Sequence, residues 1–217
     1  MVSLDYLVIG SGIAGLSFAL KMAHKCPDRT VFIVSKADED ESNTKYAQGG
    51  VASVSDLTED SYQKHISDTM IAGDGLCDAA IVEMVVKEGP ERMRELMSWG
   101  VRFDTGKNGR LALGREGGHS VHRILHHKDN TGYEIEQALL NQVRQRPNIT
   151  IFQHHFAIDL ITEHQLHGIN PAPATCYGAY VLDQKSGIVE TFRAKNTILA
   201  TGGCLLYTSP SPRDDIS

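Results

Sequence analysis

The sequence predicts an α/β fold that combines a parallel sheet with a late β-meander, and three observations support this prediction. The short apolar run 7–9 is followed by glycines and then by a helical pattern, as in a strand–helix–strand unit. The β-rich runs 176–182 and 188–193 flank a turn that contains Gly187 and indicate a hairpin. The last apolar run, 197–203, ends in small residues, which is typical of a buried strand that leads into a second glycine-rich turn.

The first turn has the glycine spacing of a dinucleotide-binding loop. Gly10, Gly12 and Gly15 follow the first strand in G-x-G-x-x-G order. Gly10 is expected to make the tight turn, Gly12 to let the backbone approach a pyrophosphate, and Gly15 to let the next helix pack closely on the strand. That helix, expected over 16–25, directs its N-terminal N–H groups at the phosphates. A dinucleotide is therefore the expected ligand.

The end of the second strand, expected over 30–35 and parallel to the first, departs from the NAD pattern. NAD domains usually have an Asp or Glu there, which binds the ribose hydroxyls. This chain has Ser35 and Lys36 instead. Two alternatives follow: NADP, with Lys36 near a 2′-phosphate, or another way of holding the adenosine half of a dinucleotide.

The middle of the chain is predicted to be helical over 60–72 and 79–87, with Asp78 as the N-cap of the second helix. Pro90 is expected in the first turn of a separate helix that ends before Gly100. Four large apolar side chains of these helices are expected in the core: Met84, Met93, Met97 and Trp99.

The following helix is expected to begin with a capping box formed by Thr131 and Glu134 and to end before Pro147. Strands are then expected over 149–152 and 157–162, ahead of the hairpin. The elements are expected in this order along the chain: a strand–helix–strand unit, a late meander and a final strand that ends in A-T-G-G. This order is typical of a Rossmann-like flavoprotein with a two-dinucleotide fold.

The densest polar cluster lies at 115–129 and includes four histidines, two arginines and Glu116. On a helix, His119, His122 and His126 would share a face, but Gly117–Gly118 indicates a loop and no carboxylate or cysteine set completes a metal site. No metal is therefore expected. Two interpretations of this cluster remain open. One is an exposed charged loop; the other is an anion-binding loop in which Arg115, Arg123 and the histidines bind a substrate carboxylate while Glu116 selects a cationic group.

Composition favours a small-molecule partner. The net charge of −6 is spread along the chain, with no basic stripe for nucleic acid and no polybasic membrane anchor. No segment reaches the ~18 apolar residues that a membrane span needs, and Met1 leads directly into a strand rather than a signal peptide. The four cysteines are far apart and form no C-x-x-C pair. A cytoplasmic protein with reduced thiols is expected.

Four motifs carry a family resemblance: V-I-G-S-G-I-A-G at 8–15, N-T-K-Y-A-Q-G-G at 43–50, R-E-G-G-H-S at 115–120 and I-L-A-T-G-G at 198–203. With H-x-x-D-x-T-G at 126–132, they resemble the flavoprotein family of succinate dehydrogenase and fumarate reductase, and within it the L-aspartate oxidases. The resemblance covers nearly all of the sequence from Asp5 to Gly203 and implies an N-terminal portion of an FAD-binding domain over 1–203.

The resemblance implies FAD as the cofactor. Asn43 stands where the dehydrogenases carry the histidine that bonds covalently to the flavin, so FAD is expected to bind noncovalently. The segment 43–50 is expected along the flavin, and Phe156 and Ala157 near the adenine. The implied cofactor contacts are Gly10, Ser11, Gly12, Ile13, Ala14, Gly15, Lys36, Asn43, Thr44, Lys45, Tyr46, Ala47, Gln48, Gly49, Gly50, Phe156, Ala157, Thr201 and Gly202.

The resemblance also implies a substrate and partners. Glu116, His119 and Ser120 are expected to orient L-aspartate, with Glu116 facing its α-ammonium where the dicarboxylate enzymes carry an apolar aromatic residue. The implied reaction is oxidation to iminoaspartate with oxygen or fumarate as acceptor, the first step of NAD biosynthesis, and the product could pass to quinolinate synthase. The alternatives are a fumarate reductase or succinate dehydrogenase flavoprotein and a non-catalytic FAD-binding fragment.

Two expectations concern the end of the sequence. Residues 204–217 match nothing expected of the family, and we interpret them as a non-native or frameshifted, disordered tail on a truncated gene model. The arginine that the family uses for proton transfer lies in a capping domain, downstream of residue 217, so no catalytic residue is assigned within this chain. The chain alone is therefore expected to be inactive and poorly soluble.

Overall fold

The computed structural model describes residues 2–107, 109–168 and 174–203. These residues form two compact units, one made of 2–43, 142–168 and 174–203 and the other of 44–107 and 109–141. Each unit is described by itself. The expectation for 204–217 lies outside the described residues.

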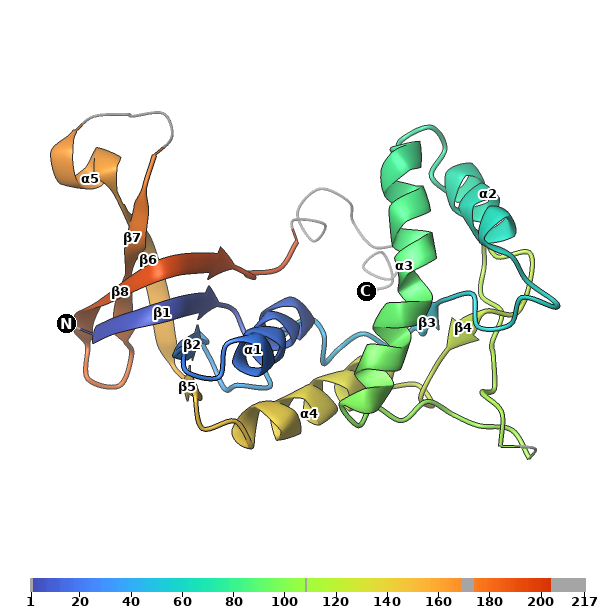
Figure 1. Ribbon diagram of the computed structural model, residues 1–217, viewed down its shortest axis with the longest axis horizontal. Coiled ribbons are helices and arrows are strands. Elements are labelled where there is room, and N and C mark those ends of the chain that lie inside the picture. Colours follow the sequence, from blue (N-terminus) through green and yellow to red (C-terminus); the bar gives the residue numbers. More distant parts are fainter. Residues whose placement is uncertain (1, 108, 169–173, 204–217) are drawn as a thin grey trace, which may run out of the picture. The chain divides into compact units, whose positions relative to one another are not determined.

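The first unit is built on a six-stranded sheet in the order β5-β2-β1-β8-β7-β6 (Figure 1). Strands β5, β2, β1 and β8 are parallel, and β7 and β6 continue the sheet as an antiparallel meander. This confirms the predicted α/β fold. The strands are β1 (Val2–Ile9), β2 (Val31–Val34), β5 (Ile149–Phe152), β6 (His155–Thr162), β7 (Cys176–Asp183) and β8 (Ile188–Leu199), and the helices are α1 (Ile13–Lys25) and α5 (Glu163–His167).

Strand β8 joins the two kinds of pairing. Its first half pairs antiparallel with β7, from Ile188 to Arg193, and its second half pairs parallel with β1 as far as Leu199. The two apolar runs predicted separately at 188–193 and 197–203 are therefore one strand, which ends before Ala200. This continuity places the final glycine-rich turn directly beside the first one.

The first turn requires glycine for two reasons. Gly10 has φ +113°, and a Cβ there would lie 2.2 Å from the carbonyl oxygen of Ala200. A Cβ on Gly15 would lie 2.1 Å from the carbonyl oxygen of Gly10, so α1 packs against the turn itself. The tight turn and the close helix packing that were predicted for these two glycines are confirmed.

An aromatic cluster lies at the core of this unit. The rings of Phe32 and Phe152 have centroids 4.9 Å apart, and Phe152 lies 5.1 Å from Phe192. They adjoin buried aliphatic side chains of four strands, including Leu7 and Val181. Helix α1 packs through its own buried face, which consists of Gly15, Leu16, Ala19, Leu20 and Ala23. Since Leu7 and Val8 are both fully buried, the central strand is covered on both faces.

Within 44–107 and 109–141, the second unit contains two helices, most of a third and a short two-stranded ribbon. The helices are α2 (Tyr62–Ala72), α3 (Ala79–Ser98) and α4 (Thr131–Arg144), and the ribbon pairs β3 (Val51–Ala52) with β4 (Ile124–Leu125). Asp78 caps α3 as predicted, because its carboxylate accepts hydrogen bonds from the backbone N–H groups of Ala80 and Ile81.

Helix α3 corrects the prediction of two helices. It runs through Pro90 without a break, although proline cannot donate the hydrogen bond of that turn. Val86, Met93 and Leu96 are buried at i, i+7 and i+10, so one apolar stripe crosses the proline and keeps both halves in one helix. Met84 falls outside this stripe and is 48% exposed, so its predicted place in the core is wrong.

The predicted capping box of α4 is also wrong. Thr131 is already the first residue of the helix, and its hydroxyl accepts a hydrogen bond from the N–H of His127. The carboxylate of Glu134 accepts a hydrogen bond from the N–H of Arg102 instead of reaching back to the start of its own helix. Both side chains therefore bind segments that precede α4 in the sequence.

We expect Gly10→Ala to lower the free energy of unfolding by at least about 2 kcal/mol, since it combines a strained backbone with a steric clash. The matched control is Gly187→Ala, where φ is +72° and no atom lies within 4 Å of the added Cβ. That variant should lose only about 1 kcal/mol. Urea denaturation followed by circular dichroism measures both values. Equal losses would show that the contact with Ala200 does not matter.

Candidate functional site

In the first unit, the turn between β1 and α1 forms a site suited to an anion. Helix α1 begins at Ile13 after Gly12, with no side-chain cap and no acidic residue in its first turn. The first turn itself therefore contributes no negative charge at the positive end of the helix dipole. Ser11 is buried, and its hydroxyl donates a hydrogen bond of 3.2 Å to the hydroxyl of Ser35.

Ser35 has a structural role where NAD domains carry their acid. Its hydroxyl accepts from Ser11 and donates to the carbonyl oxygen of Asp38, which joins the end of β2 to the glycine-rich turn. A carboxylate at this position could not donate the second hydrogen bond. The serine therefore stabilises the turn and the loop that follows β2.

The ends of β1 and β8 bring three predicted positions together. The N–H of Ala200 donates a 2.9 Å hydrogen bond to the carbonyl oxygen of Ile9, so Thr201 and Gly202 begin next to the first turn. The amide nitrogen of Asn43 lies 3.8 Å from where a Cβ on Gly202 would be.

A second group of predicted positions lies where β6 begins. The N–H of His155 donates to the carbonyl oxygen of Ser35 at 2.8 Å, and the N–H of His154 donates to that of Ala37 at 3.1 Å. Lys36 is thus held beside the start of β6, with its own side chain exposed. The next two residues of β6 are Phe156, which is 46% exposed, and Ala157, which packs on the core.

In the second unit, the predicted flavin segment 44–50 is packed closely by two glycines. The N–H of Gly132 donates to the carbonyl oxygen of Ala47 at 2.9 Å, and a Cβ on Gly132 would lie 1.9 Å from the carbonyl oxygen of Thr44. A Cβ on Gly50 would lie 2.3 Å from the Cγ2 of Ile124. The motif at 126–132 therefore supports the segment 44–50 through direct backbone contact.

The motif R-E-G-G-H-S forms a turn. The carbonyl oxygen of Glu116 accepts a 3.3 Å hydrogen bond from the N–H of His119, and Gly118 has φ +82°, which favours glycine. The loop expected from Gly117–Gly118 is confirmed. The carboxylate of Glu116 accepts a 3.1 Å hydrogen bond from the N–H of Gly50. The predicted substrate residue Glu116 therefore contacts the predicted cofactor segment.

Arg123 corrects the prediction of an anion-binding arginine. Its side chain is fully buried and forms a bidentate pair with Asp60, at 2.8 and 2.9 Å. It also donates to Asp68 at 2.6 Å and to Nδ1 of His119 at 3.0 Å. Hydrogen bonds within the protein occupy this guanidinium, so it cannot bind a substrate carboxylate as positioned here.

The same network restricts Ser120. Both its N–H and its hydroxyl donate to the carboxylate of Asp68, each at 2.8 Å. Ser120 can therefore offer a ligand only the lone pairs of its hydroxyl oxygen. Of the predicted substrate residues, Ser120 thus retains acceptor capacity alone, and an ammonium or a carboxylate of a ligand is better served by Glu116 and His119.

The network sets the charge of its members. Burial raises the pKa of Asp68, but the hydrogen bonds from Ser120 and Arg123 outweigh burial and lower it to about 2. Burial also raises the pKa of Asp60, but the hydrogen bonds from Arg123 and Ser61 and the charge of Arg123 together outweigh burial and lower it. For His65, burial is the main cause of a lowered pKa, with a smaller contribution from the Arg123 cation.

The sequence analysis missed Asp60 and Asp68. The helical pattern of 60–72 could have indicated that Asp68 lies one turn beyond His65, on the same side of α2. Nothing in the pattern identifies a partner 55 residues later in the chain. A buried ion pair of this sequence separation becomes visible only in the folded unit.

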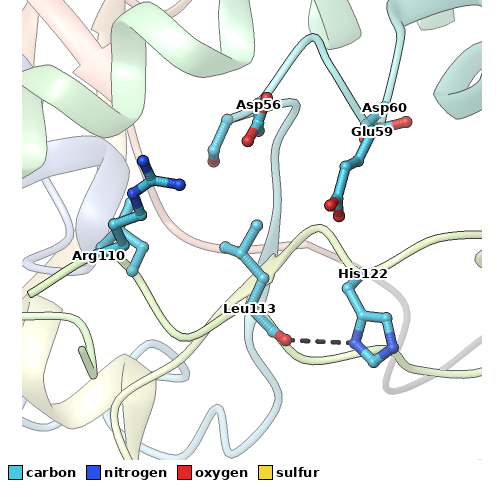
Figure 2. A pocket seen from close by; sticks show the side chains of 8 residues that line it. Asp56, Glu59, Asp60, Arg110, Leu113 and His122 are labelled. Atoms are coloured by element: carbon cyan, nitrogen blue, oxygen red, sulfur yellow. Dashed lines mark hydrogen bonds between the residues drawn. The ribbon is translucent and has the colours of Figure 1, made fainter. Parts of the chain in front are cut away.

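A hollow of about 300 Å³ also lies in the second unit, lined by Ser55, Asp56, Glu59, Asp60, Arg110, Leu111, Leu113 and His122. Figure 2 shows Arg110 and His122 on opposite sides of Leu113, with Nδ1 of His122 bonded to the carbonyl oxygen of Leu113 at 3.3 Å. Asp56 has its own partner in Thr58, which lowers the pKa of Asp56 through hydrogen bonds. The predicted cofactor and substrate residues do not line this hollow.

Within 2–107, 109–168 and 174–203, no group of three or more His, Cys, Asp or Glu side chains could hold a metal ion. None of the helices in these ranges combines the length and the apolar character needed to cross a membrane.

The chain matches the family model described as FAD binding domain over residues 5–211. It is 50% identical over 199 residues to the chloroplastic L-aspartate oxidase of Arabidopsis thaliana, covering 92% of this chain and 29% of that protein. It is 44% identical over 217 residues to the L-aspartate oxidase of Yersinia pestis, covering 98% and 40% respectively. Among solved structures, a mutant of E. coli quinol fumarate reductase FrdA matches with a TM-score of 0.84 at 29% identity, covering 94% of this chain and 33% of that chain. The chain thus spans less than half the length of these relatives.

We expect Arg123→Met to lower the free energy of unfolding of the second unit by about 3–5 kcal/mol, because two carboxylates lose their buried counter-ion. Lys87→Met is the matched control, since Lys87 pairs with Glu83 on the exposed face of α3. It should cost no more than about 0.5 kcal/mol. Fluorescence of Trp99, the single tryptophan, reports urea unfolding of this unit. A loss below 1 kcal/mol for Arg123→Met would contradict the structural role.

Acid should weaken the same unit through Asp68. Its folded pKa of about 2 lies below the value of ~3.9 for an unfolded chain, so its contribution is present above pH ~4 and is lost as the pH falls toward 2. We expect Trp99-monitored stability to fall over this range in the parent chain. The slope should be smaller in Asp68→Asn. Equal slopes in both proteins would rule Asp68 out as the titrating group.

Proposed function

We propose that this chain, which belongs to the FAD-binding domain family and is a homologue of the L-aspartate oxidases, contributes the FAD site and part of the substrate site of an L-aspartate oxidase. The family match supports FAD as the cofactor. Because the relatives are much longer, the reaction is proposed for a protein of their length that carries this sequence. The product would be iminoaspartate.

The residues present fit FAD. Gly10 and Gly15 form a turn that no side chain could enter, directly before the start of α1, where the N-cap residue Gly12 has no side chain to exclude a pyrophosphate. We propose that the exposed Lys36 and Phe156 serve the adenosine end of the cofactor. The segment 44–50 would lie along the flavin. Asn43 has no side-chain nucleophile of the histidine type, so the cofactor would be held noncovalently.

The contact between Glu116 and Gly50 is the single observation that carries the substrate proposal. It attaches a carboxylate to the segment proposed to lie along the flavin. A bound flavin supplies the two-electron oxidation of the substrate amine, so the protein's task is to present that amine to it. The carboxylate of Glu116 would bind the α-ammonium, and His119, three residues later in the same turn, would donate to a substrate carboxylate.

The acceptors and partners that we propose rest on the family resemblance. Oxygen or fumarate would reoxidise the flavin, and iminoaspartate could be handed to quinolinate synthase as part of NAD biosynthesis. The cytoplasm is the compartment we propose, although the Arabidopsis relative is named chloroplastic. We also propose that the 217 residues alone bind FAD without turning over aspartate.

Reduction of fumarate or oxidation of succinate is the second candidate, because a fumarate reductase shares this fold with a TM-score of 0.84. Glu116 argues against it. A dicarboxylate without an ammonium group would place its own negative charge near that of Glu116, with no cation to offset the repulsion. A non-catalytic FAD-binding fragment is the remaining alternative.

The purified chain is expected to carry FAD, visible in its absorbance spectrum. Acid precipitation should release the flavin into the supernatant, because no covalent bond is expected at Asn43. Flavin that stays with the precipitate would contradict noncovalent binding. A chain that folds and takes up no FAD on titration would overturn the cofactor proposal. Aspartate-dependent peroxide production by the chain would overturn its proposed inactivity.

In a protein of the relatives' length, Glu116→Gln should lower kcat/KM for L-aspartate about 10- to 100-fold, since a charge-assisted hydrogen bond to an ammonium is lost. Glutamine can still accept the hydrogen bond from Gly50. Glu134→Gln is the matched control: its carboxylate also accepts from a backbone N–H at 3.1 Å, that of Arg102. It should leave the kinetics unchanged. If Glu116→Gln behaved like the control, the specificity role would be refuted.

A further inference from the structure

A hydrogen bond joins the side chains of Arg123 and His119. The Nη1 of Arg123 lies 3.0 Å from Nδ1 of His119 and 2.6 Å from Oδ2 of Asp68. Nε and Nη2 of the same guanidinium are directed to the two carboxylate oxygens of Asp60. Asp60 and Asp68 thus fix the plane of the guanidinium, and Nη1 has one hydrogen for Asp68 and one for His119.

Arginine has only donors, so Nδ1 of His119 must be the acceptor in this contact. A neutral imidazole that accepts at Nδ1 carries its proton at Nε2. The opposite tautomer would direct an N–H at the N–H of a fully buried guanidinium, which has no room to turn away because both aspartates hold it. The geometry therefore selects one tautomer.

The backbone and the ring of His119 also have partners within the protein. Its carbonyl oxygen accepts from Nε of Arg115 at 3.0 Å, and its N–H donates to Glu116 within the turn. The ring of His65 packs edge-to-face against the ring of His119, with centroids 5.6 Å apart. The backbone, Nδ1 and the side of the ring that faces His65 are thus constrained, and His119 remains partly exposed.

We propose that Arg123, fixed by Asp60 and Asp68, is a positioning residue that holds His119 as the Nε2–H tautomer, a neutral donor for a carboxylate of the ligand. This inference rests on the proposed function for the identity of the ligand. The turn 116–119 then offers an acceptor for an ammonium at one end and a donor for a carboxylate at the other. Such a pair is suited to an α-amino acid, which carries both groups.

The tautomer can be measured in the chain itself, without cofactor or substrate. In the histidine-¹⁵N-labelled chain near neutral pH, the His119 signals are identified by their loss in His119→Gln. We expect the shift of an unprotonated nitrogen at Nδ1 and of a protonated one at Nε2. A proton on Nδ1, or the averaged shifts of two exchanging tautomers, would overturn the inference.

Two further measurements test the role of Arg123. With arginine also labelled, a ¹⁵N–¹⁵N coupling across the hydrogen bond should join Nη1 of Arg123 to Nδ1 of His119. In Arg123→Lys, the shifts of His119 should move toward those of a tautomer mixture, while Asp68→Asn, which keeps the arginine, should retain Nε2–H. If Arg123→Lys fails to fold by Trp99 fluorescence, the coupling in the parent chain decides, and its absence would refute the contact.

The tautomer of His119 and its role in substrate binding can be tested separately. The second test measures the KM for L-aspartate in a protein of the relatives' length. His119→Gln keeps an N–H donor near the position of Nε2, whereas His119→Leu keeps the size and loses the donor. We expect the KM for L-aspartate to rise about 10-fold or more in the leucine variant and less than about 3-fold in the glutamine variant. An Nε2–H tautomer with equal KM values would leave the role of Arg123 standing and refute His119 as a substrate donor. An Nδ1–H tautomer would refute the inference even with aspartate activity intact.

Discussion

The second unit depends on one buried cation. The guanidinium of Arg123 is fully buried, and four of its five N–H groups are directed to Asp60, Asp68 and His119. Removing a charge from water costs several kcal/mol, so this arrangement is stable only because two carboxylates and good geometry offset the cost. A well-packed apolar triad could be equally stable. The ion pairs also orient side chains. They fix the positions of the side chains in the loop 115–120, which has no regular secondary structure.

Glycine provides the complementary constraint. Around the segment 44–50, Gly132 approaches Thr44 and Ala47 so closely that no side chain fits between them, and Gly50 meets Ile124 in the same way. Gly118 lets the 115–120 loop turn back so that Glu116 and His119 share one hydrogen bond. In the proposed site, backbone segments therefore pack directly against one another. Hydrogen bonds then hold a few charged side chains in place on these segments.

The sequence correctly predicted structural features that depend on residues close to one another in the chain. The strand–glycine–helix unit at Gly10 to Gly15, the hairpin around Gly187 and the cap at Asp78 were all confirmed, because periodicity, turn chemistry and capping act over a few residues. The four ordered motifs also indicated the family, which the match over residues 5–211 confirms.

The wrong predictions share a physical cause. Pro90 indicates a helix start by local rules, but packing of Val86 and Met93 on either side of it keeps α3 continuous. Thr131 and Glu134 have the spacing of a capping box, yet each finds a partner outside the helix. Binding of a substrate carboxylate by Arg123 was one of two interpretations left open, and its carboxylate partners lie more than 50 residues earlier in the chain. In each case a tertiary contact outweighs a local preference, and such contacts cannot be read from spacing.

The buried pairs also bear on substrate selection. Arg123 would be an obvious carboxylate binder, but Asp60 and Asp68 already compensate its charge. Together with Arg115 and Glu116, the cluster around the turn has two guanidinium groups and three carboxylates, and so carries excess negative charge. It is therefore a poor environment for a second substrate carboxylate unless a cation accompanies it. L-Aspartate and succinate differ by one ammonium group, and under the proposed function that group would meet the excess charge at Glu116. The neutral donor proposed at His119 would fit this balance, because it would bind a carboxylate without cancelling the negative potential that is proposed to select the ammonium.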